Sequence, residues 1–123
     1  MRTSLALFLG LSLLLWASVG LAGWQEDYRK ALSRQNFTEA LRIAQSQAEL
    51  GDAEAQNCLG LLYLNGQGVN MAEVEGLSLL MVAAKNGSVA ARGNSEFMKM
   101  RMKQEHVDKA SEVASNHRWR RNR

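Results

Sequence analysis

The side chains best suited to catalysis or metal binding are few and widely spaced in this chain. His106 and His117 are 11 residues apart, which on one helix is three turns and about 16 Å, too far for both to bind one metal ion. Glu73 and Glu75 fall on different faces of a predicted helix. The sequence has no HExxH, GxSxG or phosphate-loop pattern. We therefore expect no catalytic, cofactor-binding or metal-binding residue and no small-molecule substrate.

The sulfur-containing side chains are also predicted to pack in the fold rather than to do chemistry. Cys58 is the only cysteine, so an internal disulfide is impossible, and its apolar neighbours predict a small buried hydrophobe. A reactive thiol or an intermolecular disulfide is the alternative. Met98 and Met102 share a helix face with His106 four residues further on, a conceivable soft-metal site. We expect these methionines to pack in a helix, because methionine is a good helix former.

The elements that must position these residues follow from an internal repeat. Residues 51–55 (GDAEA) recur 36 residues later as residues 87–91 (GSVAA). In each copy, Gly51 or Gly87 suits the left-handed position that ends a helix, and Asp52 or Ser88 suits the N-cap of the next. A fixed period of this size predicts stacked helical hairpins. Arrays of this kind usually bind macromolecules through an extended surface.

Between the two copies lies a detailed helix–turn–helix pattern. Ala55, Leu59 and Leu62 form one apolar stripe. Gly60 interrupts the same helix at a cost of about 1 kcal/mol, which predicts the close approach of another helix. Gly68 allows a positive φ in the turn that follows. A second helix is expected over about 72–86, and its predicted inner residues are Leu77, Leu80, Met81 and Ala84.

This segment resembles the Sel-one-like repeat, a branch of the tetratricopeptide-like helical repeats. The family pattern is Ala, Leu-Gly-x-x-Tyr, Gly-x-Gly-Val and then Ala-Ala-x-x-Gly. The corresponding residues here are Ala55, Leu59-Gly60, Tyr63, Gly66-Gln67-Gly68-Val69 and Ala83-Ala84-Lys85-Asn86-Gly87. The chain departs from the pattern at Leu79-Leu80-Met81, where an aromatic pair is common. The resemblance implies a right-handed α-solenoid whose function is to scaffold protein complexes.

The flanking segments predict one further hairpin on each side. Helices are expected over 24–34 and 36–50 before the central repeat, and over 89–103 and 104–116 after it. The third hairpin lacks the Gly-x-Gly turn, as expected of a terminal repeat that caps a stack. The predicted fold is therefore all-α, a short solenoid of about three helical hairpins over residues 23–116, with a signal peptide before it and a basic tail after it.

The N-terminal residues predict export. Arg2 precedes an apolar run that begins at Leu5, and the small residues Gly20 and Ala22 stand at −3 and −1 of a cleavage site. Residues 1–22 are therefore predicted to be a signal peptide cleaved between Ala22 and Gly23, which places the protein in the periplasm or outside the cell. The alternative is an uncleaved helix that anchors the protein in a membrane.

Charge is concentrated at the C-terminus of a chain whose net charge is +3. The tail over 117–123 carries four arginines and a tryptophan, namely Arg118, Trp119, Arg120, Arg121 and Arg123. A solvated tail is the favoured interpretation. The alternative is attachment to an anionic envelope surface, for which a tryptophan among arginines is well suited. Because no basic face extends along the body, we expect no nucleic-acid partner.

The candidate binding face lies on the first helix of the central repeat. Glu54, Asn57, Leu61 and Leu64 fall opposite the apolar stripe of that helix. First helices line the concave surface of tetratricopeptide-like arrays, so these residues would meet a partner. The alternative is that Leu61 and Leu64 pack on the preceding hairpin.

These patterns predict a non-enzymatic adaptor that binds an unknown protein or peptide. An envelope-surface-associated protein is the alternative. An inhibitor or immunity-like protein that occludes an enzyme would use the same surface as the adaptor.

Overall fold

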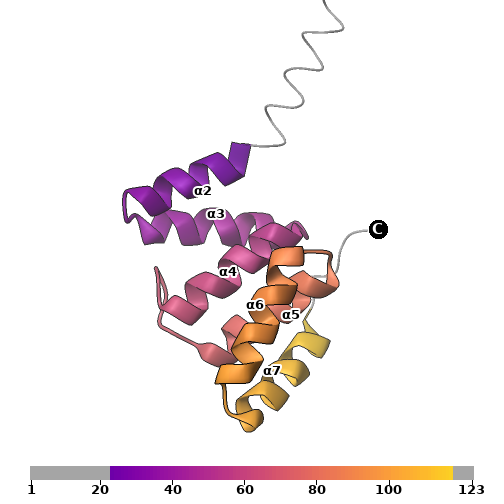
Figure 1. Ribbon diagram of the computed structural model, residues 1–123. Helices are drawn as coiled ribbons and strands as arrows, with labels where there is room; N and C mark the ends of the chain where they lie inside the picture. The colour runs from indigo at the N-terminus through magenta and orange to yellow at the C-terminus, as the bar shows by residue number, and fades with distance from the viewer. Residues whose placement is uncertain (1–22, 118–123) are drawn as a thin grey trace, which may run out of the picture.

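The computed structural model describes residues 23–117 of the chain, and these residues form six α-helices (Figure 1). In chain order the helices are α2 (Gly23–Ser33), α3 (Phe37–Glu49), α4 (Ala53–Asn65), α5 (Glu73–Lys85), α6 (Val89–Arg101) and α7 (Gln104–Asn116). The all-α prediction is confirmed. The segment around Met98 is helical as expected, and the predicted bounds of α7 match the observed ones.

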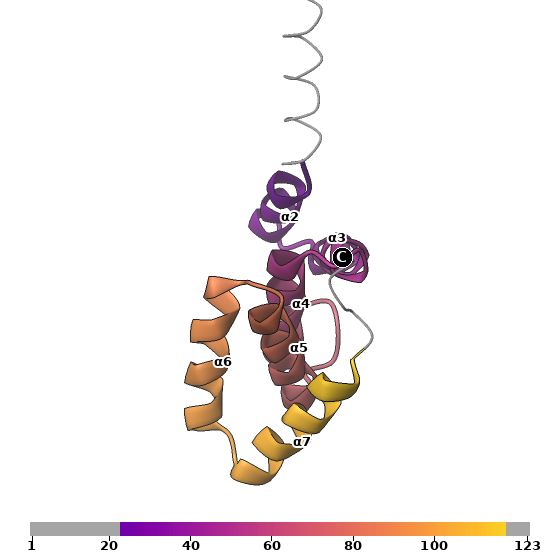
Figure 2. The ribbon, with the colours of Figure 1, turned by 90° about the vertical axis from the view of Figure 1, so that its right-hand side faces the viewer.

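The helices pack in chain order, like three successive hairpins. Helix α2 packs on α3, α3 on α4, and α4 on α5. The third hairpin is open, because α6 and α7 each pack against α5 rather than closely against one another. Figure 2 shows α6 on one side of α4 and α5, with α3 and α7 on the other. This arrangement leaves α6 at the edge of the molecule.

The helix ends of the internal repeat form as the sequence predicts. Gly51 has φ of 89° and Gly87 has φ of 109°, in the left-handed region that favours glycine. Side-chain oxygens of Asp52 and Ser88 each accept a hydrogen bond from the backbone N–H three residues ahead, at 2.9 and 3.1 Å. Each copy of the repeat therefore ends one helix and caps the next by the same chemistry.

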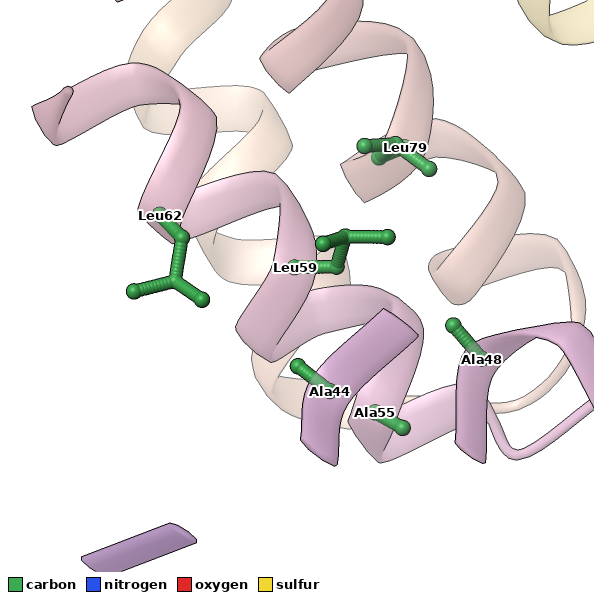
Figure 3. Packing of buried hydrophobic residues seen from close by; sticks show 6 residues of the cluster. All are labelled: Ala44, Ala48, Ala55, Leu59, Leu62 and Leu79. Atoms are coloured by element: carbon green, nitrogen blue, oxygen red, sulfur yellow. The ribbon is translucent and has the colours of Figure 1, made fainter. Parts of the chain in front are cut away.

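The first apolar cluster joins α3, α4 and α5 (Figure 3). The predicted stripe of Ala55, Leu59 and Leu62 is buried in it. Ala44 and Ala48 supply the face of α3 that meets this stripe, and their small side chains let the two helices come close. The members of the cluster are Ala44, Ala48, Ala55, Leu59, Leu62 and Leu79.

Helix α5 is the central helix of the second half of the array. Leu77 and Leu80 are buried as predicted, whereas Met81 and Ala84 are only half-buried. The sequence predicted one inner face for this helix, but Leu79, Val82 and Ala83 are also buried. The reason is that α4, α6 and α7 all pack on α5. A second cluster forms where Leu77 meets Val107 and Ala110 of α7.

Two glycine contacts fix how the helices approach one another, one within the second hairpin and one between the second hairpin and the first. A Cβ at Gly60 would lie 3.0 Å from the carbonyl oxygen of Gly76, which confirms the predicted close approach of a second helix, here α5. Gly68 has φ of 76°, and a Cβ there would lie 2.5 Å from the carbonyl oxygen of Phe37. The turn of the second hairpin therefore rests directly on the first turn of α3.

A buried polar side chain of α4 links α3 to α5. Gln56 is fully buried in α4. Its Nε2 donates to the carbonyl oxygen of Ala48 at 3.3 Å, and its Oε1 accepts from Nδ2 of Asn86 at 2.8 Å. The amide thus joins the end of α3 to the end of α5, and both of its polar ends are satisfied.

Candidate partner-binding face on α4

The four predicted binding residues have different environments. Glu54 is exposed, and Leu61 and Leu64 are half-buried. Asn57 is only 6% exposed. The side chain of Leu64 lies close to α5, since its Cγ would be 2.6 Å from a Cβ added at Gly76. Glu54 and Leu61 are therefore the members of the set most available to a partner, and the binding assignment itself stays a prediction.

Asn57 holds α6 in place beside this face. Its Oδ1 accepts a hydrogen bond at 3.0 Å from Nδ2 of Asn94, 37 residues away on α6. The two amides form a bridge between the first helices of the second and third hairpins. A buried amide of this kind positions a neighbouring helix, because an unpaired group there would carry the full cost of desolvation.

Cys58 lies on the side of the face nearer to α2. The thiol is half-buried and packs, like the side chain of Tyr28, against the first apolar cluster. Burial raises the pKa of the Cys58 thiol to about 11, and burial followed by the contact with Cys58 raises the pKa of Tyr28. The thiol is therefore protonated near neutral pH and is a poor nucleophile. Cys58 thus packs on the apolar cluster as predicted, but it is half-buried rather than buried.

The accessible part of α4 thus lies between two fixed helices. Glu54, Cys58 and Leu61 follow a spacing of four and three residues and occupy one line along α4. Tyr28 of α2 packs with Cys58 on one side of this line, and Asn94 of α6 donates a hydrogen bond to Asn57 on the other. Helices α2 and α6 therefore flank the accessible line on α4.

A cavity on the other side of α4 was not predicted from the sequence. It has a volume of about 220 Å³ and lies among α3, α4, α5 and α7. Its lining residues are Gln45, Leu59, Tyr63, Glu75, Ser78, Leu79, Val113 and His117. Burial lowers the pKa of His117 there. The lining comes from four helices, so no spacing in the sequence could have revealed this cavity.

A second hollow, of about 490 Å³, lies where α2 crosses the end of α3. Trp24 lines it together with the charged side chains of Asp27, Arg42 and Asp52. Its lining is more polar than that of the cavity beside Leu59. We do not assign it a ligand, because charged groups of both signs surround it.

The residues considered for metal binding are dispersed. Nδ1 of His106 lies 3.8 Å from a carboxylate oxygen of Glu73, whereas His117 lies just beyond the other end of α7. Among residues 23–117, no three His, Cys, Asp or Glu side chains are placed to hold a metal ion. Met98 and Met102 pack against the cluster of Leu77 and α7.

The predicted terminal segments lie largely outside the described residues. The signal peptide over 1–22 and the basic residues Arg118–Arg123 belong to the parts that are not described. Gly23, the residue after the predicted cleavage site, is the first residue of α2. Among the described helices, none has the length and apolar character needed to cross a bilayer. No protein-family model matches the chain.

Proposed function

We propose that this chain is a non-enzymatic interaction module that binds a protein or peptide along the face formed by α2, α4 and α6. In this proposal the six helices are a short right-handed solenoid of Sel-one-like hairpins. The internal repeat and the packing of the helices in chain order support that interpretation. The absence of a catalytic pattern in the sequence favours binding over chemistry.

The observation that carries the proposal is the fixed position of α4 between its neighbours. The Asn57–Asn94 hydrogen bond holds α6 on one side of the accessible line on α4. On the other side, Tyr28 of α2 packs together with Cys58 against the first apolar cluster. A surface that is already ordered loses less conformational entropy when a partner binds. Glu54 offers a negative charge and Leu61 an apolar contact, so the partner would present a basic or donor group beside an apolar side chain.

We propose further that the module acts after export, in the periplasm or outside the cell. The apolar N-terminal run and the small residues before Gly23 support this. Retention of the N-terminal helix would instead place the same face beside a membrane.

The test is site-specific photo-crosslinking of the protein in its own envelope. A diazirine side chain of leucine size replaces Leu61 on the proposed face or, as a control, Glu112 on the exposed side of α7. We expect a discrete crosslinked partner from position 61 and not from position 112. The same product from both positions, or none from position 61, would reject the face.

The identified partner then allows a quantitative test. Glu54→Arg with Leu61→Ser should weaken binding at least tenfold while the melting temperature stays within a few degrees, since Glu54 is exposed and half-buried Leu61 belongs to neither apolar cluster. The matched control, Glu112→Arg with Leu50→Ser, makes the same chemical changes at exposed sites elsewhere. A large fall in melting temperature in the first variant would show that Leu61 belongs to the core.

A further inference from the structure

The outward side of α6 carries an apolar ridge. Val89, Phe97 and Met100 are 77%, 52% and 78% exposed, although all three are apolar. With Gly93 they follow spacings of four, four and three residues, which places them on one side of the helix. A Cβ added at Gly93 would meet nothing within 4 Å. Exposed apolar groups gathered in this way mark an interaction surface.

Basic side chains flank this ridge. Arg92 and Lys99 lie along one edge, and Arg101 lies along the other with its guanidinium 5.2 Å from the centre of the Phe97 ring. Lys103 follows the end of the helix. The one acidic residue of α6, Glu96, is paired with Lys99 at 2.7 Å. Both edges of the ridge therefore attract negative charge.

The basic charge is specific to this part of the described chain. Residues 89–103 carry four basic side chains against one acidic side chain, whereas the rest of residues 23–117 carry six basic against eleven acidic. The charge thus changes sign between α6 and the body of the array. Two copies of α6 would repel each other, so a symmetric dimer through this ridge is disfavoured.

The size of the ridge favours a lipid surface over a folded protein. A helix of 13 residues is about 20 Å long and about 10 Å wide. Such a ridge covers roughly 200 Å², against the roughly 800 Å² per partner of a stable protein interface. A peripheral membrane contact needs less apolar area, because attraction to anionic lipids adds to it. Arginine and lysine at the edges can extend to headgroups while the apolar side chains enter the boundary.

We propose that α6 is a peripheral membrane-binding helix that docks on anionic phospholipid headgroups through Val89, Phe97 and Met100 with flanking Arg92 and Arg101. Figure 2 shows α6 standing at the edge of the molecule, where a flat surface can reach it. The lipid-binding ridge is distinct from the accessible line on α4, so the protein can hold a partner while it lies on a membrane. The proposal does not depend on the basic tail.

The test is co-sedimentation with vesicles of phosphatidylcholine that contain 30 mol% phosphatidylglycerol. The assay uses the protein from Gly23 onward, because all six described helices and both apolar clusters lie within residues 23–117. Arg92→Gln with Arg101→Gln should lower partitioning about 25-fold, at about fivefold for each basic residue. Phe97→Ser with Met100→Ser should lower it at least tenfold and leave the melting temperature unchanged, because both side chains are exposed.

A matched control separates the ridge from net charge. Arg42→Gln with Lys109→Gln removes the same two charges from exposed ion pairs on α3 and α7, and should change partitioning less than threefold. Equal losses in the two charge variants would overturn the proposal, as would wild-type binding that is equally strong to vesicles without phosphatidylglycerol.

Deletion of residues 118–123 separates the ridge from the tail. The shortened protein should still bind, and the α6 charge variant should still weaken it. Loss of all binding on this deletion would assign the lipid contact to the tail instead. If the wild type binds no vesicles and a photo-crosslinker at position 100 captures a protein, the ridge contacts an acidic protein partner and not a lipid. Both results would overturn this inference and leave the proposed face on α4 intact.

Discussion

The turn that joins α4 to α5 should be unusually intolerant of a single added methyl group. Gly68 has φ of 76°, which costs an alanine about 1–2 kcal/mol. The added Cβ would also lie 2.5 Å from the carbonyl oxygen of Phe37, against an ordinary carbon–oxygen contact of about 3.3 Å. Because the obstructing atom belongs to the backbone of α3, no rotamer change can relieve the overlap.

The expected loss of stability follows from these two terms. Overpacking costs about 1–3 kcal/mol, and the lower entropy of the unfolded alanine chain returns about 0.4–1 kcal/mol. We therefore expect Gly68→Ala to destabilise the fold by about 2–4 kcal/mol. That is a large part of the roughly 5–15 kcal/mol of a typical domain.

Gly87→Ala is the matched control for this prediction. Gly87 also has a positive φ, of 109°, but nothing lies within 4 Å of its added Cβ. It should therefore lose only the conformational term of about 1–2 kcal/mol, less the same unfolded-chain term, which leaves a net loss of about 0.5–1.5 kcal/mol. Urea unfolding followed by circular dichroism measures both variants, and unchanged m values show that the same surface is exposed on unfolding. Equal losses would refute the contact between the turn and α3.

Three further predictions concern helix packing, the thiol and export. Gly60→Leu should lower the free energy of unfolding by about 3 kcal/mol or more, because it forces α4 away from α5. Gly93→Ala, with open space around it, should raise it by about 0.5–1 kcal/mol. Equal urea midpoints for the two variants would contradict the close approach of α4 and α5. Burial raises the pKa of Cys58 from 9.0 to about 11. The stability that the neutral thiol contributes is therefore present below pH 9 and is lost as the pH rises through 11. Thiolate absorbance near pH 9 in the folded protein would contradict this. N-terminal sequencing of the exported protein should begin at Gly23, and an intact Met1 on membrane-bound protein would instead indicate an anchor.

The binding face shows where prediction from the sequence stops. Helical periodicity correctly placed Glu54, Asn57 and Leu61 away from the apolar stripe of α4, because that depends only on 100° per residue. Periodicity did not show that Asn57 is buried under α6, since its partner Asn94 lies 37 residues away. Nor could it find the cavity beside Tyr63, whose lining comes from four helices.

The sequence by itself determined the local structure of this protein. Glycines that tolerate a positive φ, and the capping oxygens of Asp52 and Ser88, act on groups within a few residues, so the helix ends and the three-hairpin order could be predicted. The apolar stripe of α4 followed in the same way.

Only the tertiary structure decided which faces are covered. Helix α5 is buried nearly all round because α4, α6 and α7 converge on it. Helix α6 keeps Val89, Phe97 and Met100 exposed because α7 packs on α5 and leaves the outer side of α6 open. Apolar spacing alone cannot separate these cases, since a stripe is buried only where another element lies against it.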